Sequence, residues 1–318
     1  MSHFFLGVDG GKSSTTALIG DEARRVVGYG QGGPCNHVGE AEGRAKFTSA
    51  IVDSVSAACA QAGIDFAGIA FESACLGFSG GPADKEAILR EILNCKRMTV
   101  TDDALIALTG ATAGEPGLIV ISGTGSIAFG RNEARKTARA GGWGYIFGDE
   151  GSAFDIARQA LRAALRHEEG WGPPTALGEV LLRETASSTV NDALHRLYTS
   201  EFPRPRIASL AKAVDGAAAE GDAVAIRILE TAAQQLATLA GAVRGQIFAP
   251  GDPARVSYIG GVFRSARILE RFRVLVELGT VNRVDRPVYG PAAGALIEAY
   301  RAVNADVSLS GVPEVEKQ

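Results

Sequence analysis

The 318-residue chain carries 32 lysines and arginines against 36 aspartates and glutamates, which gives a net charge of −4 at pH 7. A chain of this length can bury a substantial core and can form two domains. The acidic balance argues against a nucleic-acid-binding surface, which normally shows a basic stripe. The sequence has no apolar run of about 18 residues and no signal-peptide pattern at its start. We therefore expect a soluble cytoplasmic protein that binds neither membranes nor nucleic acid.

The first pattern along the chain is a glycine-rich turn between two apolar runs. Residues 4–9 predict a buried strand, residues 10–14 (GGKSS) a tight turn, and residues 15–19 a returning strand. The amides and hydroxyls of such a turn can bind phosphate oxygens, while the carboxylate of Asp9 can hold hydrated Mg²⁺.

The rest of the first half alternates between strand and helix patterns, which fits an α/β fold. We expect strands at 25–30, 70–78 and 98–101 and helices at 41–62, 83–94 and 104–113. The last of these strands delivers Asp102 and Asp103 to the start of a helix, where one of them can cap the helix. Glycine and proline at 112–116 mark the boundary of the first domain.

Cysteine usage gives no sign of a metal centre. Cys35, Cys59, Cys75 and Cys95 are widely and irregularly spaced, with no CxxC pair and no histidine at ligand spacing. Cys59 and Cys75 lie in apolar segments, so we expect both in the core, and we expect Cys35 to pack as well.

A second glycine-rich hairpin follows about 110 residues after the first, which implies a duplicated unit. Residues 117–121 and 127–130 predict strands, and residues 122–126 (SGTGS) form the turn between them. Neither turn matches a Walker or Rossmann phosphate loop, because each leads into a strand rather than a helix.

The segment 141–152 (GGWGYIFGDEGS) joins glycine turns, a tryptophan and two adjacent carboxylates in front of an amphipathic helix. Carboxylates can accept hydrogen bonds from sugar hydroxyls, and glycines allow the backbone to approach a ligand. The alternative is an ordinary helix start, at which Asp149 or Glu150 satisfies free backbone amides.

The remainder predicts several helices between 152 and 241, of which 217–243 is the longest continuous candidate. A strand at 255–259 enters Gly260 and Gly261, and a helix follows Arg264. A last helix is expected at 291–303, and the tail after residue 304 is expected to be mobile.

Five of these motifs together resemble the actin-like ATPase and sugar kinase superfamily. They are the DGG and SGTGS hairpins, TDDA at 101–104, the segment 141–152, and IGGV at 259–262. Within the superfamily the chain resembles the BadF/BadG/BcrA/BcrD ATPase group, and within that group the N-acetylglucosamine kinases. The motifs span roughly residues 4–300, nearly the whole chain.

The resemblance implies an α/β fold of two duplicated actin-like, ribonuclease H-like domains with an interdomain cleft. The N-terminal domain would comprise residues 1–115, joined by the C-terminal helix 290–304. The second domain, with its helical insertion, would comprise residues 116–289.

The resemblance also assigns roles to individual residues. Asp103 would be the general base that orients the attacking hydroxyl and accepts its proton. The sugar would be bound by a set drawn from both halves of the chain: Asn36, Asp103, Thr124, Gly142, Trp143, Asp149 and Glu150. The residues alone favour a turn role for Asn36 and a core position for Trp143. The roles of Asp102 and Glu150 stay open.

ATP and Mg²⁺ are the implied cofactors, and the phosphates would lie near both hairpins. The nucleotide-binding residues would be Gly10, Gly11, Lys12, Ser13, Ser14, Thr124, Gly125, Gly260 and Gly261, with Asp9 on Mg²⁺-bound water. The last two glycines would let adenosine approach the backbone.

The implied reaction is ATP-dependent phosphorylation of the 6-hydroxyl of N-acetylglucosamine. Because members of the resembled family frequently dimerise, the resemblance also implies a homodimer. A glucosamine kinase would differ only in accepting a free amine. An ATPase activator of a radical dehydratase would need cysteines for an iron–sulfur cluster, and the cysteine pattern argues against it. A nucleotide-dependent sensor or scaffold without turnover is the third alternative, which an intact Asp103 and Asp149 pair disfavours.

Overall fold

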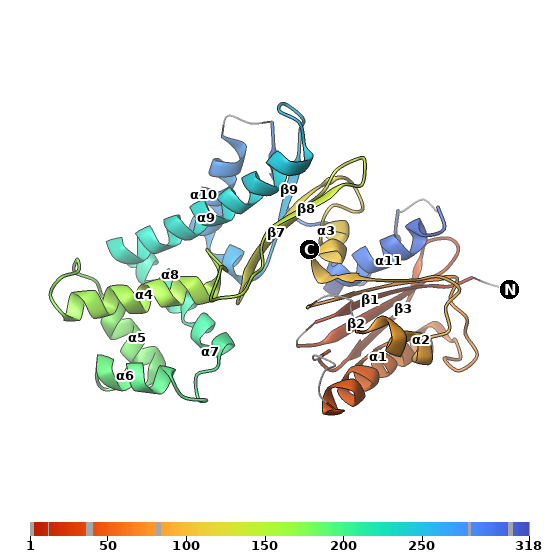
Figure 1. The fold of residues 1–318 in the computed structure, drawn as a ribbon, viewed down its shortest axis with the longest axis horizontal. Helices are drawn as coiled ribbons and strands as arrows, with labels where there is room; N and C mark the ends of the chain where they lie inside the picture. The colour runs from red at the N-terminus through yellow and green to blue at the C-terminus, as the bar shows by residue number, and fades with distance from the viewer. Residues whose placement is uncertain are drawn as a thin grey trace. The chain divides into compact units, whose positions relative to one another are not determined.

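A computed structural model of the chain describes residues 3–11, 13–35, 41–80, 84–278, 281–304 and 308–317. The chain divides into two compact units, one formed by Met1–Gly117 with Arg286–Gln318 and the other by Leu118–Asp285. Each unit is built on its own five-stranded sheet (Figure 1). Lys12 and Asn36, both predicted to contact ligands, lie outside the described residues.

The sheet of the first unit has the strand order β3-β2-β1-β4-β5. Its strands are β1 (Phe5–Gly10), β2 (Thr15–Gly20), β3 (Val26–Gly32), β4 (Ser73–Phe78) and β5 (Met98–Asp102). The first three form an antiparallel meander, whereas β4 runs parallel to β1 and β5 runs parallel to β4. The predicted hairpin at the start of the chain is confirmed.

The sheet of the second unit repeats this order as β8-β7-β6-β9-β10, so the predicted duplication is confirmed. Its strands are β6 (Gly117–Ser122), β7 (Ser126–Arg131), β8 (Thr137–Gly141), β9 (Arg255–Ile259) and β10 (Arg283–Asp285). The sequence analysis did not predict β8 or β10. β8 carries no long apolar side chain, and β10 is only three residues long, so neither has a period-two apolar pattern that could be recognised.

In the first unit, helices cover both faces of the sheet (Figure 1). One face packs on α1 (Ala41–Ala62) and α2 (Glu86–Ile92), and the other on α3 (Asp103–Ala111) and α11 (Pro291–Arg301). Alternation along β1 explains the two cores, because Leu6 joins the α1 cluster while its neighbour Phe5 joins the α11 cluster. The chain therefore returns at its end to complete the unit in which it began.

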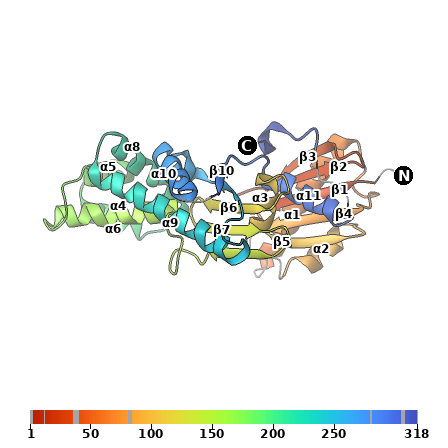
Figure 2. The ribbon, with the colours of Figure 1, turned by 90° about the horizontal axis from the view of Figure 1, so that it is seen from above.

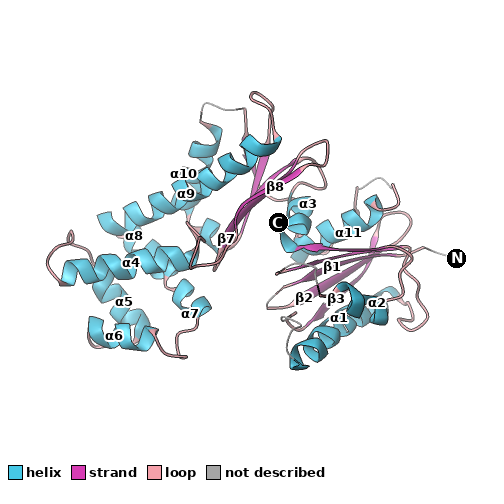
Figure 3. Cartoon of the chain, viewed as in Figure 1, coloured by secondary structure: helices cyan, strands magenta, loops and turns pink. Residues whose placement is uncertain are grey.

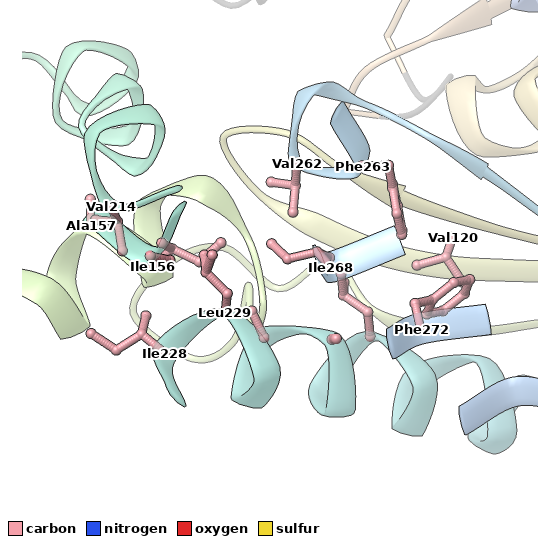
Figure 4. Packing of buried hydrophobic residues seen from close by; sticks show 14 of the residues in the cluster. Val120, Ile156, Ala157, Val214, Ile228, Leu229, Val262, Phe263, Ile268 and Phe272 are labelled. Atoms are coloured by element: carbon pink, nitrogen blue, oxygen red, sulfur yellow. The ribbon is translucent and has the colours of Figure 1, made fainter. Parts of the chain in front are cut away.

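Helices alone fill the stretch between β8 and β9 (Figures 2 and 3). They are α4 (Ala153–Glu168), α5 (Leu177–Thr185), α6 (Val190–Leu197), α7 (Arg204–Ser209), α8 (Ala211–Ala219) and α9 (Ala223–Ile247). After β9 come the 3₁₀ turn η1 (Gly261–Arg264) and α10 (Ala266–Glu277). α9 packs along β7 and β8 and against α10. Figure 4 shows Leu229 of α9 in the same apolar cluster as Ile268 and Phe272 of α10.

The expectation of one continuous helix at 217–243 is wrong. The chain breaks between α8 and α9 at Gly221, whose φ of 95° lies outside the helical region. Asp222 then caps α9, since its Oδ1 accepts hydrogen bonds from the amides of Val224 at 2.9 Å and Ala225 at 2.8 Å.

The expectation of a mobile tail is also wrong for residues 308–317. Leu309 and Val312 are buried in the α11 cluster, and Ser310 pairs with Arg25. The 3₁₀ turn η2 (Glu314–Glu316) ends on Glu316, whose carboxylate accepts a hydrogen bond from the amide of Ala293 at 3.1 Å. The tail thus satisfies backbone donors at the start of α11. These contacts stabilise the helix, because its first amides have no partner within it.

Within the described residues, no helix is both long enough and apolar enough to cross a membrane.

The packing of α3 on α11 depends on the absence of a side chain at Gly294. A Cβ there would lie 1.9 Å from the carbonyl oxygen of Ile106 and 2.4 Å from the amide nitrogen of Gly110. Neither atom is the end of a flexible side chain, so a larger residue must separate the two helices.

We expect Gly294→Ala to lower the free energy of unfolding of the first unit by about 3 kcal/mol, through overpacking. The matched control is Gly216→Ala on the exposed face of α8, where nothing lies within 4 Å of the added Cβ. That change should stabilise its helix by about 0.5–1 kcal/mol. Urea unfolding followed by circular dichroism measures both, and equal midpoints for Gly294→Ala and wild type would contradict the packing argument.

Candidate active site

The carboxyl ends of β1, β4 and β5 meet at one edge of the first sheet because these strands run parallel. Gly10 pairs with Phe78, and Phe78 pairs in turn with Asp102. In α/β proteins this edge is where ligands bind. The structure therefore brings two predicted site residues, Asp9 and Asp103, to the same edge of one sheet.

Asp103 is the first residue of α3 and is partly buried. The hydroxyl of Ser79, just after β4, donates a hydrogen bond of 2.6 Å to its Oδ2. This contact fixes the carboxylate while its second oxygen stays available to accept a proton. The neighbouring Asp102 occupies the N-cap position of α3 but is exposed and makes no side-chain capping bond. The sequence analysis gave Ser79 no role, since a serine at a strand end is common.

The hairpin after Asp9 presents exposed serines. Gly11 donates to the carbonyl of Ser14 at 3.0 Å, which closes the turn, and Ser13 and Ser14 are both exposed. A Cβ at Gly10 would overlap the ring of Phe78, so this position allows β1 and β4 to pack at the site. These are the donors expected of a phosphate-binding turn.

Burial, together with the nearby carboxylates of Glu316 and Asp103, raises the pKa of Asp9 to about 7. Burial also raises the pKa of Glu316 itself. The edge therefore concentrates negative charge that favours either protonation or a cation. Glu316 was missed because the tail that carries it was expected to be mobile.

The residues around Asp9 fit Mg²⁺ bound through water and phosphate rather than in a protein cage. Across the described ranges, no three His, Cys, Asp or Glu side chains come together as metal ligands. Mg²⁺ is commonly held by one or two carboxylates together with waters and substrate phosphates, and Asp9 supplies such a carboxylate. Its water-mediated role stays a prediction.

The raised pKa of Asp9 makes stability depend on pH in the metal-free protein. The folded state binds this proton more tightly than the unfolded chain, so stability falls as pH rises from about 4 through 7. Asp9→Asn removes this dependence. We expect wild type and Asp9→Asn to unfold alike near pH 4 and the variant to be more stable by about 4 kcal/mol at pH 8. Denaturation in EDTA across this range measures the difference, and a gap that does not change with pH would contradict the prediction.

In the second unit, the turn between β6 and β7 is tied to the segment 141–152. Ser126 donates through its hydroxyl to the carbonyl of Glu150 at 2.7 Å and through its amide to Oδ1 of Asp149 at 3.1 Å. Gly142 donates to the carbonyl of Ser126 at 3.0 Å. The structure thus places Thr124, Gly125, Gly142, Asp149 and Glu150 in one substructure, although they are spread over 27 positions of the chain.

Asp149 is buried, with 4% of its surface exposed, and both of its oxygens are engaged. Oδ1 accepts from Ser126 as described, and Oδ2 accepts from Arg204 of α7. Arg204 also donates to the carbonyl of Thr124 at 3.3 Å, and its guanidinium lies over the rings of Tyr145 and Phe154. This carboxylate therefore organises the turn between β6 and β7. No sequence signal pointed to Arg204, which lies in a helix 55 residues downstream.

The aromatic part of the same segment faces outward. Trp143 is 67% exposed, and the guanidinium of Arg139 lies over its ring, 4.6 Å from the ring centroid. Ile146 and Phe147 are exposed as well. The alternative that Trp143 is a core residue is therefore wrong, and its ring is accessible to a ligand.

The cap of α4 is Ser152 rather than Asp149 or Glu150, which corrects the helix-start alternative. The hydroxyl of Ser152 accepts a hydrogen bond from the amide of Asp155 at 3.2 Å. Asp149 lies three residues earlier with a φ of 62°, a conformation uncommon outside glycine and tolerated by aspartate. Its carboxylate is thereby directed toward the turn instead of the helix.

Gly260, at the end of β9, passes close to the end of β6. Its φ is 115°, and a Cβ would lie 2.1 Å from the carbonyl oxygen of Ser122, so the close approach requires glycine. Gly261 and Thr124 line a cavity of about 400 Å³ within this unit. Its lining also includes apolar side chains (Ile156, Leu229, Ile268) and polar ones (Lys212, Asp215, Ser265). A cavity of this size and lining suits a small organic ligand.

Two duplicated α/β units, each with a glycine-rich hairpin, define the chain as a two-domain protein of the actin-like ATPase class. The family model of the BadF/BadG/BcrA/BcrD ATPases matches residues 6–299. The chain belongs to this family, and an ATPase family implies ATP as its nucleotide.

Proteins similar to this chain are named as amino-sugar kinases. The chain is 33% identical to an N-acetylmuramic acid/N-acetylglucosamine kinase of Clostridium acetobutylicum, over 86% of this chain and 90% of that protein. It is 29% identical to an N-acetyl-D-glucosamine kinase of Dictyostelium discoideum, over 75% and 78%. A crystal structure of a candidate N-acetylglucosamine kinase from Chromobacterium violaceum superposes with a TM-score of 0.73 at 26% identity, covering 92% of this chain and 98% of that one.

Proposed function

We propose that the protein transfers the γ-phosphoryl group of ATP to the 6-hydroxyl of N-acetylglucosamine. The observation that carries the proposal is the pair Ser79 and Asp103, a carboxylate fixed through one oxygen at the sheet edge that also holds Asp9. Membership in an ATPase family and the names of its relatives support the nucleotide and the amino sugar.

The nucleotide has suitable surroundings in each unit. In the second unit, the cavity beside Thr124 and Gly261 is of a size for adenosine, with an apolar wall for the base and polar groups for the ribose. In the first unit, Ser13 and Ser14 offer hydroxyls to phosphate oxygens, and Asp9 can hold a water of the metal ion. Bound Mg²⁺ would neutralise charge on the transferred phosphoryl group.

Asp103 would orient the sugar hydroxyl and accept its proton as the bond to phosphorus forms. Ser79 serves as a positioning residue, because its hydrogen bond fixes the rotamer of Asp103. Arg204 and Asp149 would hold the turn that carries Thr124 in place. Since phosphoryl transfer is loose, this positioning should matter more than the basicity of the carboxylate.

Asp103→Asn should lower kcat by about 100- to 10,000-fold and leave the KM for sugar nearly unchanged, because the amide keeps the contact with Ser79 but cannot accept the proton. Asp102→Asn is the matched control, one residue away and exposed, and should retain activity. Steady-state kinetics with Mg²⁺-ATP measure both. Turnover near wild type in Asp103→Asn would remove this residue from the role of base.

The substrate is tested by coupled ADP release with N-acetylglucosamine, glucosamine, N-acetylmannosamine, N-acetylmuramic acid and glucose. We expect the highest kcat/KM with N-acetylglucosamine. N-acetylmuramic acid is the second candidate, since the Clostridium relative is named for both sugars. No sugar-stimulated ADP release would overturn the kinase proposal, whereas a preference for glucosamine would overturn only the acetyl assignment.

The cysteines favour a kinase over the activator of a radical dehydratase. Cys59 and Cys75 are buried in the core as predicted, and the Sγ of Cys35 is hydrogen-bonded with the hydroxyl of Thr15 at 2.9 Å. Burial raises the pKa of Cys59 and of Cys95 to about 11, which disfavours the thiolate form that cluster ligands take. The homodimer implied by the resemblance stays a prediction, which light scattering in solution can measure.

A further inference from the structure

A groove between α4 and α9 in the second unit is lined by arginines that neither the fold nor the proposed reaction requires. Its volume is about 540 Å³, within the range of small-molecule sites. Arg158, Arg162 and Arg166 follow one another at four-residue spacing and so share one face of α4. Arg227 lines the same groove from α9.

The charge of this groove is not balanced by its own lining. Asp155 is the one carboxylate among the lining residues, and it is already engaged, since its Oδ1 accepts from Arg158 at 2.6 Å and its Oδ2 from Gln159 at 2.9 Å. Like charges four residues apart destabilise a helix, so the stripe on α4 costs stability unless an anion neutralises it. The excess of positive charge makes the groove a candidate site for an anion.

Several polar atoms in the groove are free to meet a ligand. Within the part of the chain that the structure describes, the guanidinium groups of Arg162 and Arg227 make no ion pair or hydrogen bond. The Nε of Arg158 and the amide oxygen of Gln235 are buried without a partner. Such groups cost about 1–3 kcal/mol each when unsatisfied, which a ligand with both acceptors and a donor would recover.

The chemistry of the groove narrows the class of ligand. Guanidinium groups bind phosphate in a bidentate manner, and four of them suit more than one anionic group. Val224, Ile228 and Pro173 give the groove an apolar part that can pack against carbon atoms. Gln235 can accept a hydrogen bond from a hydroxyl or an amino group.

We propose that this groove is a second binding site, distinct from the candidate active site, for a small phosphorylated organic anion. Both sugar phosphates and nucleotides have this chemistry. The four arginines and Gln235 lie on α4 and α9, and none of them is assigned to the proposed reaction, so the site does not depend on the proposed kinase activity.

The test measures binding of two probes by calorimetry, fructose 1,6-bisphosphate for the sugar phosphates and ADP for the nucleotides. The double variant Arg162→Ala with Arg227→Ala should weaken binding of at least one probe at the groove by tenfold or more and leave basal sugar phosphorylation unchanged. The matched control, Arg267→Ala with Arg271→Ala, removes two exposed arginines from a groove on α10 that also contains Asp215, Glu230 and Glu270. The control should bind like wild type.

A second readout keeps the test independent of activity. The chain has two tryptophans, and the guanidinium of Arg166 lies 4.8 Å from the ring of Trp171. In Trp143→Phe protein, the fluorescence of Trp171 should change on binding and should respond less at high salt. If neither probe binds in a manner that depends on Arg162 and Arg227, the proposal is overturned. It is also overturned if an acidic peptide, tested in parallel, binds in this manner and the two probes do not. The kinase proposal would survive either result.

Discussion

The constraint on which both units depend is the burial of a carboxylate beside a glycine-rich hairpin. Asp9 lies near the end of β1 in the first unit, and Asp149 contacts the turn before β7 in the second. The two are compensated differently. Asp149 has a guanidinium and a backbone amide as partners, whereas Asp9 lies near two further carboxylates and its pKa rises. A buried charge that is paired holds a turn in shape, and one that is unpaired is ready for a proton or a cation.

Glu316, whose carboxylate helps to raise the pKa of Asp9, is held in place by the start of α11. Glu316 accepts from the amide of Ala293, and its carbonyl accepts from Gly290 at 2.8 Å, so the tail and the start of α11 form one piece. α11 in turn packs on α3 through Gly294, and α3 begins at Asp103. The position of the candidate base is therefore set by the sheet, by two helices and by ten residues that follow the last helix.

Most of the first unit could be predicted because its signals are local. Helix 41–62 was predicted to the residue, and the two hairpins follow from glycine turns between apolar runs. The break at Gly221 and the cap at Asp222 also have local sequence signals, a glycine followed by an aspartate. We missed them because the helical apolar pattern continues on both sides. Arg204 and Glu316 had no local signal at all. Each acts on a residue far away in the sequence, and only the folded backbone defines such a contact.

The helical insertion is connected to the candidate site of the second unit, because Asp155 of α4 is hydrogen-bonded to the segment 141–152. Its Oδ2 accepts from the amide of Gly151 at 3.2 Å, two residues after Asp149, while its Oδ1 pairs with Arg158 in the arginine-lined groove. An anion that draws Arg158 away from Asp155 would change the electrostatic environment of that carboxylate, and hence its hold on Gly151. The turn between β6 and β7, which contains Thr124, is hydrogen-bonded to the same segment, because the hydroxyl of Ser126 donates to the carbonyl of Glu150. One side chain thus links the groove on α4 with the turn between β6 and β7, through contacts that lie entirely within a single unit.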